Sequence, residues 1–272
     1  MITKVLSGLK LYAIQGEGSQ TFLDAKWIRF LIRNTPKNYK KTVALNVLAL
    51  SPHYFLGEKE KRKKTFLIRE YKRNLLSRQL LYKYVVSNYI TPETVVMDYG
   101  CGPGFLAKIV ASKCRKLYAL DISDGVLLCA DTINHGDNLN YLNVLKNRAE
   151  SIPDASIDLI YTFAVLQHVS GKLVDDIFNL FYKKLREGGK ALIQVQLPDP
   201  NWKTEEEWTA DQSLMGRFKY KYGLNCFSNT LSFYQEKLAN NKLKFHSMVK
   251  MKELLPYSFD DIYNQQLIIA EK

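Results

Sequence analysis

The 272-residue sequence lacks the features of a membrane-spanning, secreted or low-complexity protein. No apolar run approaches the roughly 18–20 residues needed to cross a bilayer. The apolar stretch near the N-terminus is too short for a signal peptide. With 46% hydrophobic and 24% charged residues, the composition is that of an ordinary globular protein. We therefore expect a cytoplasmic protein.

Cysteine is also scarce. The four cysteines show no CxxC spacing, so neither a disulfide framework nor a zinc site is expected, and the metal prediction is none. The lack of a CxxxCxxC cluster also argues against radical chemistry. We expect reduced thiols at Cys101, Cys114, Cys129 and Cys226.

Acidic residues are rare in the first third of the chain. Residues 1–90 carry 18 Lys and Arg against 5 Asp and Glu, whereas residues 91–272 carry 21 against 22. The whole basic excess therefore lies in the first segment. The predicted domains are a basic helical N-terminal cap at 1–90, with helices over 24–50 and 61–90, and a second domain at 91–272 that contains an insert at about 198–230.

Beyond residue 94, short apolar runs alternate with segments of helical periodicity. This alternation predicts an α/β fold with a doubly wound, mostly parallel sheet covered on both faces. Helices are expected at 105–113, 123–135 and 174–185. The predicted strands are 95–97, 116–120, 139–144, 159–163, 191–196, 244–250 and 266–270.

The stretch VVMDYGCGPGFL, residues 95–106, places a glycine turn at the end of the first strand, where such sheets bind ligands. A dinucleotide fingerprint requires a third glycine where this chain has Phe105. Asp98 would repel a pyrophosphate but suits a cationic amino acid moiety. Asp121 ends the next strand and could accept hydrogen bonds from ribose hydroxyls. Two simpler interpretations stay open: the glycines only form the turn, and Asp121 caps a helix.

Four successive segments resemble the class I S-adenosylmethionine-dependent methyltransferases over roughly residues 90–200. They are VMDYGCGPG, YALDIS, NRAESIPDASIDLIYTFAVLQHV and LREGGKALIQV. The resemblance implies a seven-stranded, Rossmann-like methyltransferase fold. It also implies the cofactor S-adenosyl-L-methionine and the product S-adenosyl-L-homocysteine.

The resemblance assigns a role to each matching position. The turn would pass under the methionine part of the cofactor, Asp121 would hold the ribose, and Ile122 would pack on the adenine. Arg148 stands where the family commonly has an acidic residue, and arginine cannot accept a hydrogen bond from the adenine amino group. Backbone groups or Glu150 would then hold the adenine. The implied cofactor-binding residues are Asp98, Gly100, Cys101, Gly102, Gly104, Asp121, Ile122, Arg148, Ala149 and Phe163. Cys101 is interpreted as a small turn residue and not as a nucleophile.

The implied reaction is methyl transfer, O- or N-directed, to a small organic molecule, lipid or glycan. His168 is the candidate catalytic residue, as a base or as a group that positions the acceptor. The alternative interpretation is that it only packs at the start of a helix. The acceptor would lie between the N-terminal helices and the insert. The insert's aromatic residues could line a pocket or form a separate small core: Trp202, Trp208, Phe218, Tyr220, Tyr222 and Phe227.

The basic N-terminal region admits three interpretations: a solvated helix face, contact with an anionic membrane or an acidic substrate, and nucleic-acid binding. No recognisable RNA-binding module supports the last, so nucleic acid is the least favoured partner. An RNA methyltransferase and a non-catalytic cofactor-binding or partner protein remain the alternative functions. Tyr54 could close over the cofactor.

Overall fold

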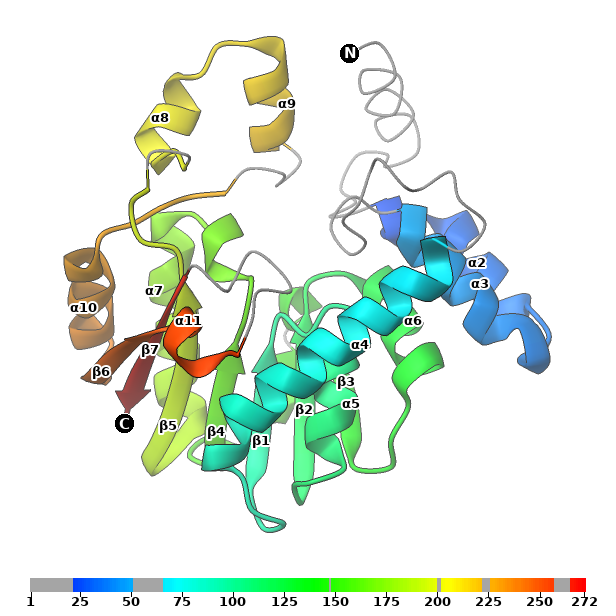
Figure 1. Ribbon diagram of the computed structural model, residues 1–272, viewed down its shortest axis with the longest axis horizontal. Helices are drawn as coiled ribbons and strands as arrows, with labels where there is room; N and C mark the ends of the chain where they lie inside the picture. Colours follow the sequence, from blue (N-terminus) through cyan, green and yellow to red (C-terminus); the bar gives the residue numbers. More distant parts are fainter. Residues whose placement is uncertain (1–21, 51–65, 147, 200–201, 222–225, 257–264) are drawn as a thin grey trace.

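A computed structural model describes residues 22–50, 66–146, 148–199, 202–221, 226–256 and 265–272 (Figure 1). Its centre is a seven-stranded sheet of order β3-β2-β1-β4-β5-β7-β6. The first five strands are parallel, and β7 runs antiparallel to β5 and β6. The strands are β1 Val95–Tyr99, β2 Lys116–Asp121, β3 Leu139–Asn143, β4 Ile157–Thr162, β5 Leu185–Val195, β6 Lys244–Lys250 and β7 Gln266–Glu271. The seven predicted strands and the mostly parallel sheet are confirmed.

Helices cover both faces of the sheet, as its apolar runs require. In β1, Val95 and Met97 pack on one face and Val96 on the other, so the run is buried on both sides. One face packs against α7 (Gly171–Lys184) and α10 (Leu231–Asn240). The opposite face packs against α4 (Phe66–Tyr84), the short helix η2 (Val86–Tyr89), α5 (Phe105–Ala111) and α11 (Met251–Leu254).

The N-terminal segment forms a third apolar cluster with the domain. It consists of η1 (Phe22–Asp24), α2 (Lys26–Asn34) and α3 (Lys37–Leu50), which pack on α6 (Asp124–Asn134). The single helix expected over 24–50 is wrong, because Pro36 disfavours a helical conformation at the preceding residue. Thr35 is accordingly extended, with φ −68° and ψ 134°.

The second predicted N-terminal helix is shorter than expected. Residues 61–65 and Tyr54 lie outside the described residues, and after α4 the chain continues in the 3-10 helix η2 instead of an α-helix. Tyr71 of α4 packs edge-on against Phe105, with ring centroids 5.5 Å apart. The helix α4 thus joins the N-terminal segment to α5.

The insert between β5 and β6 contains two short helices, α8 (Glu205–Ala210) and α9 (Leu214–Lys221), which lie above the sheet in Figure 1. None of the helices in the described ranges has the length and apolar character of a membrane span. All four cysteines are free thiols.

The contact between η1 and α6 can be tested at Gly125. A Cβ atom at this residue would lie 2.0 Å from the backbone oxygen of Leu23, so Gly125→Ala must push η1 away from α6. We expect a loss of roughly 1–3 kcal/mol in the free energy of unfolding. Limited proteolysis should then cut within residues 22–50 faster than in the parent. Asp131→Ala, on the exposed side of α6, should leave the cleavage rate unchanged; equal rates for both variants would contradict this contact.

Candidate active site

The glycine turn connects β1 to α5 and rests on two neighbouring elements. The amides of Gly100 and Cys101 both donate to the carbonyl oxygen of Leu120, at 2.8 and 2.9 Å, so the turn is tied to β2. Gly100 has a φ of +81°, and a Cβ atom there would lie 2.2 Å from Cγ2 of Val165. Glycine is required at this position for both its conformation and its lack of a side chain.

Asp121 links the glycine turn to the turn that follows β2. One carboxylate oxygen accepts from the amide of Gly102 and the other from the amide of Ser123, both at 3.1 Å. Burial raises the pKa of Asp121 to about 6, although these backbone hydrogen bonds act to lower it. The alternative that Asp121 caps a helix is wrong: Ser123 is the N-cap of α6, and its hydroxyl accepts from the amide of Val126 at 3.2 Å.

Asp98 lies buried at the carboxyl end of β1, close to the glycine turn. The hydroxyl of Tyr161 donates to its carboxyl group at 3.1 Å. Burial raises the pKa of Asp98 to about 8, and the negative charge of Asp121 contributes in the same direction. Two buried acids beside one turn favour a ligand that brings positive charge to Asp98 and hydroxyl donors to Asp121.

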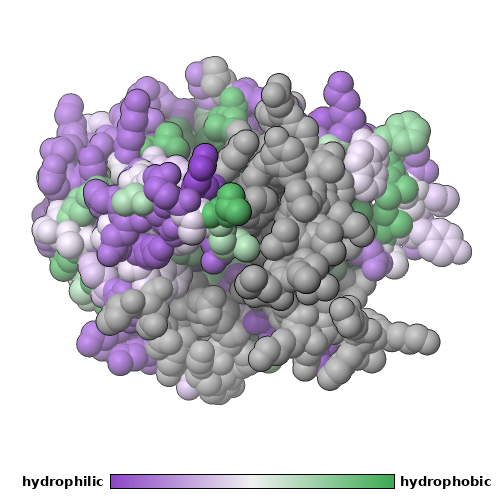
Figure 2. Space-filling view, turned by 90° about the horizontal axis from the view of Figure 1, so that it is seen from above, coloured by the Kyte–Doolittle hydropathy of each residue, from purple (hydrophilic) through white to green (hydrophobic). Residues whose placement is uncertain are grey.

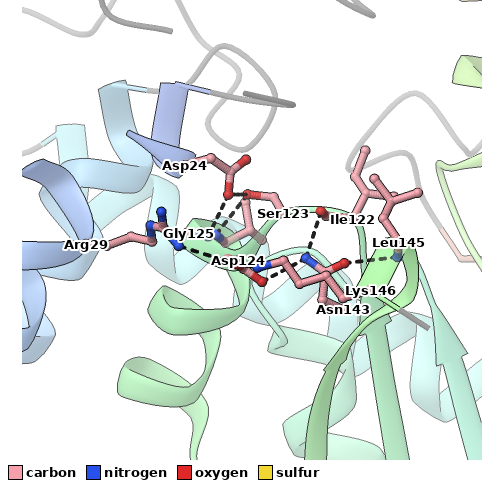
Figure 3. A network of polar contacts seen from close by, with 10 residues as sticks. Asp24, Arg29, Ile122, Ser123, Asp124, Gly125, Asn143, Leu145 and Lys146 are labelled. Carbon is pink, nitrogen blue, oxygen red and sulfur yellow. Dashed lines mark hydrogen bonds and ion pairs between the residues drawn. The ribbon is translucent and has the colours of Figure 1, made fainter. Parts of the chain in front are cut away.

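A network of polar contacts holds the turn after β2 against the N-terminal segment (Figure 3). Asp24 accepts from the hydroxyl of Ser123 and from the amide of Gly125, both at 2.9 Å. Asp124 accepts from Nη1 of Arg29 at 3.3 Å. The N-terminal segment therefore contributes directly to the geometry of this turn.

The same network continues to the end of β3. The side-chain amide of Asn143 donates to the carbonyl oxygen of Ile122 at 3.0 Å and to Asp124 at 2.8 Å. Asp124 also pairs with Lys146 of η3 (Val144–Lys146). These contacts fix the backbone of Ile122 while its side chain stays 43% exposed. An exposed apolar side chain on a fixed turn suits contact with a flat apolar ligand group.

The remaining predicted cofactor residues lie around this centre. Ala149 is buried in the short helix η4 (Arg148–Ser151), and the side chain of Arg148 lies outside the described residues. Phe163 follows β4, and its ring centroid is 5.7 Å from that of Tyr161. Burial, with the charges of the two nearby acids, raises the pKa of the Cys101 thiol well above its ordinary value. A protonated thiol agrees with the interpretation of Cys101 as a turn residue.

Three buried glutamines form a one-way chain of hydrogen bonds beneath the loop after β4. The chain begins at the amide of Ala164, which can only donate, so the side-chain oxygen of Gln194 must face it. The NH₂ group of Gln194 then donates to the oxygen of Gln265. The NH₂ group of Gln265 donates to Gln167 at 3.1 Å. Each side-chain amide is thereby fixed in a single orientation.

The chain ends at His168, the exposed last residue of the short helix η5 (Leu166–His168). Because the oxygen of Gln167 is occupied, its NH₂ group faces Nε2 of the imidazole at 3.3 Å. Nε2 is then the acceptor, and the neutral ring carries its proton on Nδ1. Nδ1 lies 3.6 Å from the sulfur of Cys226, in the insert. His168 therefore bridges the loop after β4 and the insert.

Further hydrogen bonds attach the insert to this loop. The amide of Phe227 donates to the carbonyl oxygen of Gln167 at 2.6 Å. The amide of Gly171 donates to Glu205 at 2.7 Å. The insert also has internal contacts: the indole of Trp208 donates to the carbonyl oxygen of Cys226 at 2.8 Å. The insert thus both packs on itself and covers the side of the site next to His168.

The structure adds residues that the sequence analysis missed. Ser123 could have been found from the sequence, because serine before a helical segment is a common N-cap. Asp24 stands out only as the single acidic residue of a basic segment. The glutamine chain and the partner of His168 gave no sequence signal, because their residues are far apart along the chain. The added residues are Asp24, Ser123, Asn143, Tyr161, Gln167, Gln194, Cys226 and Gln265.

Comparison with known proteins agrees with this geometry. A family model described as a methyltransferase domain matches residues 97–193, which include β2, β3 and β4, the last three residues of β1 and most of β5. A probable S-adenosylmethionine-dependent methyltransferase of Mycolicibacterium smegmatis is 28% identical over 109 residues, which are 37% of each chain. Ribosomal protein L11 methyltransferase of Paraburkholderia phytofirmans is 26% identical over 106 residues, which are 38% of this chain and 32% of the relative. The chain thus spans about a third of the length of these curated relatives.

Solved structures share the fold. Geranyl diphosphate methyltransferase in complex with S-adenosylmethionine has a TM-score of 0.55 at 16% identity, covering 81% of this chain and 98% of that one. Geranyl diphosphate C-methyltransferase of Streptomyces coelicolor has the same TM-score at 14% identity, and the match covers 88% of this chain and 99% of that one. The likeness extends the predicted Rossmann-like methyltransferase fold over most of the chain.

The buried acid predicts a pH dependence of stability. The folded-state pKa of Asp98, about 8, lies above the ordinary value of 3.8, so its stabilising contribution is complete below pH 3.8 and is lost as the pH rises through 8. Asp98→Asn removes this loss. We expect the difference in free energy of unfolding, Asp98→Asn minus parent, to increase with pH. The increase should reach about 1.4 kcal/mol per pH unit between roughly pH 5 and 8. Urea titrations measure the gain; a constant difference, as expected for the exposed control Asp137→Asn, would contradict it.

The glutamine chain predicts the protonation pattern of His168. Nitrogen-15 NMR of the imidazole should show a neutral ring protonated at Nδ1. Gln265→Leu interrupts the chain, so this preference for one tautomer should weaken. Gln235→Leu, at an exposed position, serves as the control. The same tautomer ratio in parent and Gln265→Leu would show that the chain does not fix the ring.

Proposed function

We propose that this chain, which carries a class I S-adenosylmethionine-dependent methyltransferase domain, transfers a methyl group from S-adenosyl-L-methionine to a small organic molecule, lipid or glycan. The observation that carries the proposal is the arrangement of Asp98, the glycine turn and Asp121 at adjacent strand ends. Each group has a matching part in the cofactor. The close packing of Gly100 against the side chain of Val165 holds the turn in place beside the proposed ligand position.

The proposed binding mode follows from the chemistry of these groups. The ammonium group of the methionine part lies near Asp98, and the ribose hydroxyls donate to Asp121. Because the pKa of Asp98 is raised to about 8, binding of a cation at neutral pH is accompanied by proton release from this acid. Ile122 contacts the adenine, the amide of Ala149 faces it, and Phe163 lies beside the cofactor.

The bound cofactor supplies an electrophilic methyl group, which is transferred by in-line displacement. The protein's contribution is to align the acceptor and to exclude water. The insert is fixed over η5 by the hydrogen bonds of Phe227 and Glu205, and it forms the acceptor side of the site. We place the acceptor between this insert and the glycine turn.

For His168 we propose a positioning role. Nε2 faces the NH₂ group of Gln167 and Nδ1 faces the sulfur of Cys226, so proton removal by the ring would first require one of these contacts to be exchanged. O- or N-methyl transfer with a nucleophile that needs little base assistance fits this arrangement. The geranyl diphosphate enzymes, which share the fold, also act on small molecules, as their names state.

The cofactor site is tested by Asp121→Ala. The variant loses the acceptor for the ribose hydroxyls, and hydrogen bonds to a charged group are worth about 1.5–3 kcal/mol each. We expect S-adenosylmethionine affinity, measured by calorimetry, to fall roughly a hundredfold while the far-ultraviolet circular dichroism is retained. Asp131→Ala is the matched control. Unchanged affinity for Asp121→Ala would disprove the ribose assignment.

The acceptor class is tested with cofactor carrying a labelled methyl group. The protein, or Asp121→Ala as control, is incubated with host extract and the products are separated into lipid, nucleic-acid, protein and water-soluble fractions. Label in the lipid or small-molecule fraction, absent from the control, supports the proposal. Label in RNA would identify an RNA methyltransferase. Cofactor binding without label in any fraction would identify a non-catalytic cofactor-binding protein.

A further inference from the structure

The helix α2 has two apolar faces, and only one of them is used by the fold. Ile28 and Ile32, one turn apart, are buried against the domain. Trp27, Phe30 and Leu31 lie on another side of the same helix and are 53%, 69% and 43% exposed. Three large apolar side chains at spacings of three and four form one continuous stripe on the outer surface.

Basic residues surround this exposed stripe. Lys26 and Arg33 of α2 are exposed, and α3 begins with the exposed Lys37, two residues before Tyr39, which is 65% exposed. The ammonium group of Lys41 lies over the ring of Tyr71 in α4 and is not part of this surface. In Figure 2, hydrophobic residues reach the surface among hydrophilic ones at the right, the side on which α2 and α3 lie in Figure 1. The surface formed by Lys26, Trp27, Phe30, Leu31, Arg33, Lys37 and Tyr39 is called the α2 outer face below.

Within residues 22–50, basic residues are in excess, and the single acidic residue faces the domain. Residues 22–50 contain six basic residues and one acidic residue. That acid, Asp24, is bonded to Ser123 and Gly125 of the domain. Arg29 points the same way, toward Asp124 (Figure 3), and so is not part of the outer face.

We propose that the α2 outer face is a docking surface for an anionic lipid bilayer. Aromatic and apolar side chains flanked by lysine and arginine match the boundary between lipid headgroups and acyl chains, with cations near the phosphates. A second copy of the chain fits less well, because a symmetric contact would bring two basic faces together. The proposal concerns this surface alone and does not depend on methyl transfer.

Docking through this face would bring the membrane close to the candidate site. The inner side of the N-terminal segment holds the turn after β2 through Asp24 and Arg29. Among the described residues, η1 and α2 therefore connect the proposed docking surface to the turn after β2.

Vesicle binding tests the proposal. The full chain is sedimented with vesicles of phosphatidylcholine alone or with about a third phosphatidylglycerol. We expect binding to the anionic vesicles, weakened by salt, and a roughly hundredfold loss in the partition coefficient for Trp27→Ala/Phe30→Ala/Leu31→Ala. Lys26→Glu/Lys37→Glu should lose about tenfold on anionic vesicles only. Leu76→Ala/Leu173→Ala, which removes two exposed leucines elsewhere, should bind like the parent.

A spectroscopic measurement keeps the test independent of partial unfolding. The chain has three tryptophans, so Trp202→Phe/Trp208→Phe leaves Trp27 as the sole tryptophan. Its emission should shift to the blue on addition of anionic vesicles and be quenched by brominated lipid. An unshifted spectrum, equal binding to both vesicle types, or binding to RNA or to a second copy in place of vesicles would overturn the proposal.

Discussion

The carboxylate of Asp121 is the contact on which the candidate site depends. Its two oxygens accept from amides in two different turns, the glycine turn after β1 and the turn after β2. Both turns end parallel neighbouring strands, so a single side chain sets the distance between them. The sites proposed for the methionine and adenosine parts of the cofactor are thereby held in one rigid unit.

The buried position of this unit creates its electrostatic character. Asp98 and Asp121 sit close together at low exposure, and burial raises both pKa values, to about 8 and about 6. Burial opposes ionisation of Asp98 although the positive charge of Arg78 acts to lower its pKa, so a positively charged ligand is favoured because it stabilises the ionised carboxylate. The same burial keeps the Cys101 thiol protonated and hence unreactive.

A second constraint acts on the acceptor side through uncharged groups. The amide of Ala164, which has a φ of +58°, can only donate, and this sets the orientation of three successive glutamine side chains up to His168. The insert reaches the same imidazole through Cys226. Buried amides that are fully paired specify one geometry without placing charge near the reacting groups.

The sequence by itself determined the sheet, the glycine turn and the acids at the strand ends. The apolar runs of β1, β2, β4 and β5 require burial on both faces, and the turn after Asp98 requires glycine, so local chemistry was sufficient. The sequence also showed the basic excess of residues 1–90. The single helix predicted over 24–50 is divided at Pro36 into α2 and α3. The tertiary structure alone decided that Asp24 holds the turn after β2, that Gln265 meets Gln167 across 98 residues, and that α2 keeps a second apolar face exposed. These contacts join segments distant along the chain, and no local periodicity or motif records which distant groups the folded backbone brings within hydrogen-bonding distance.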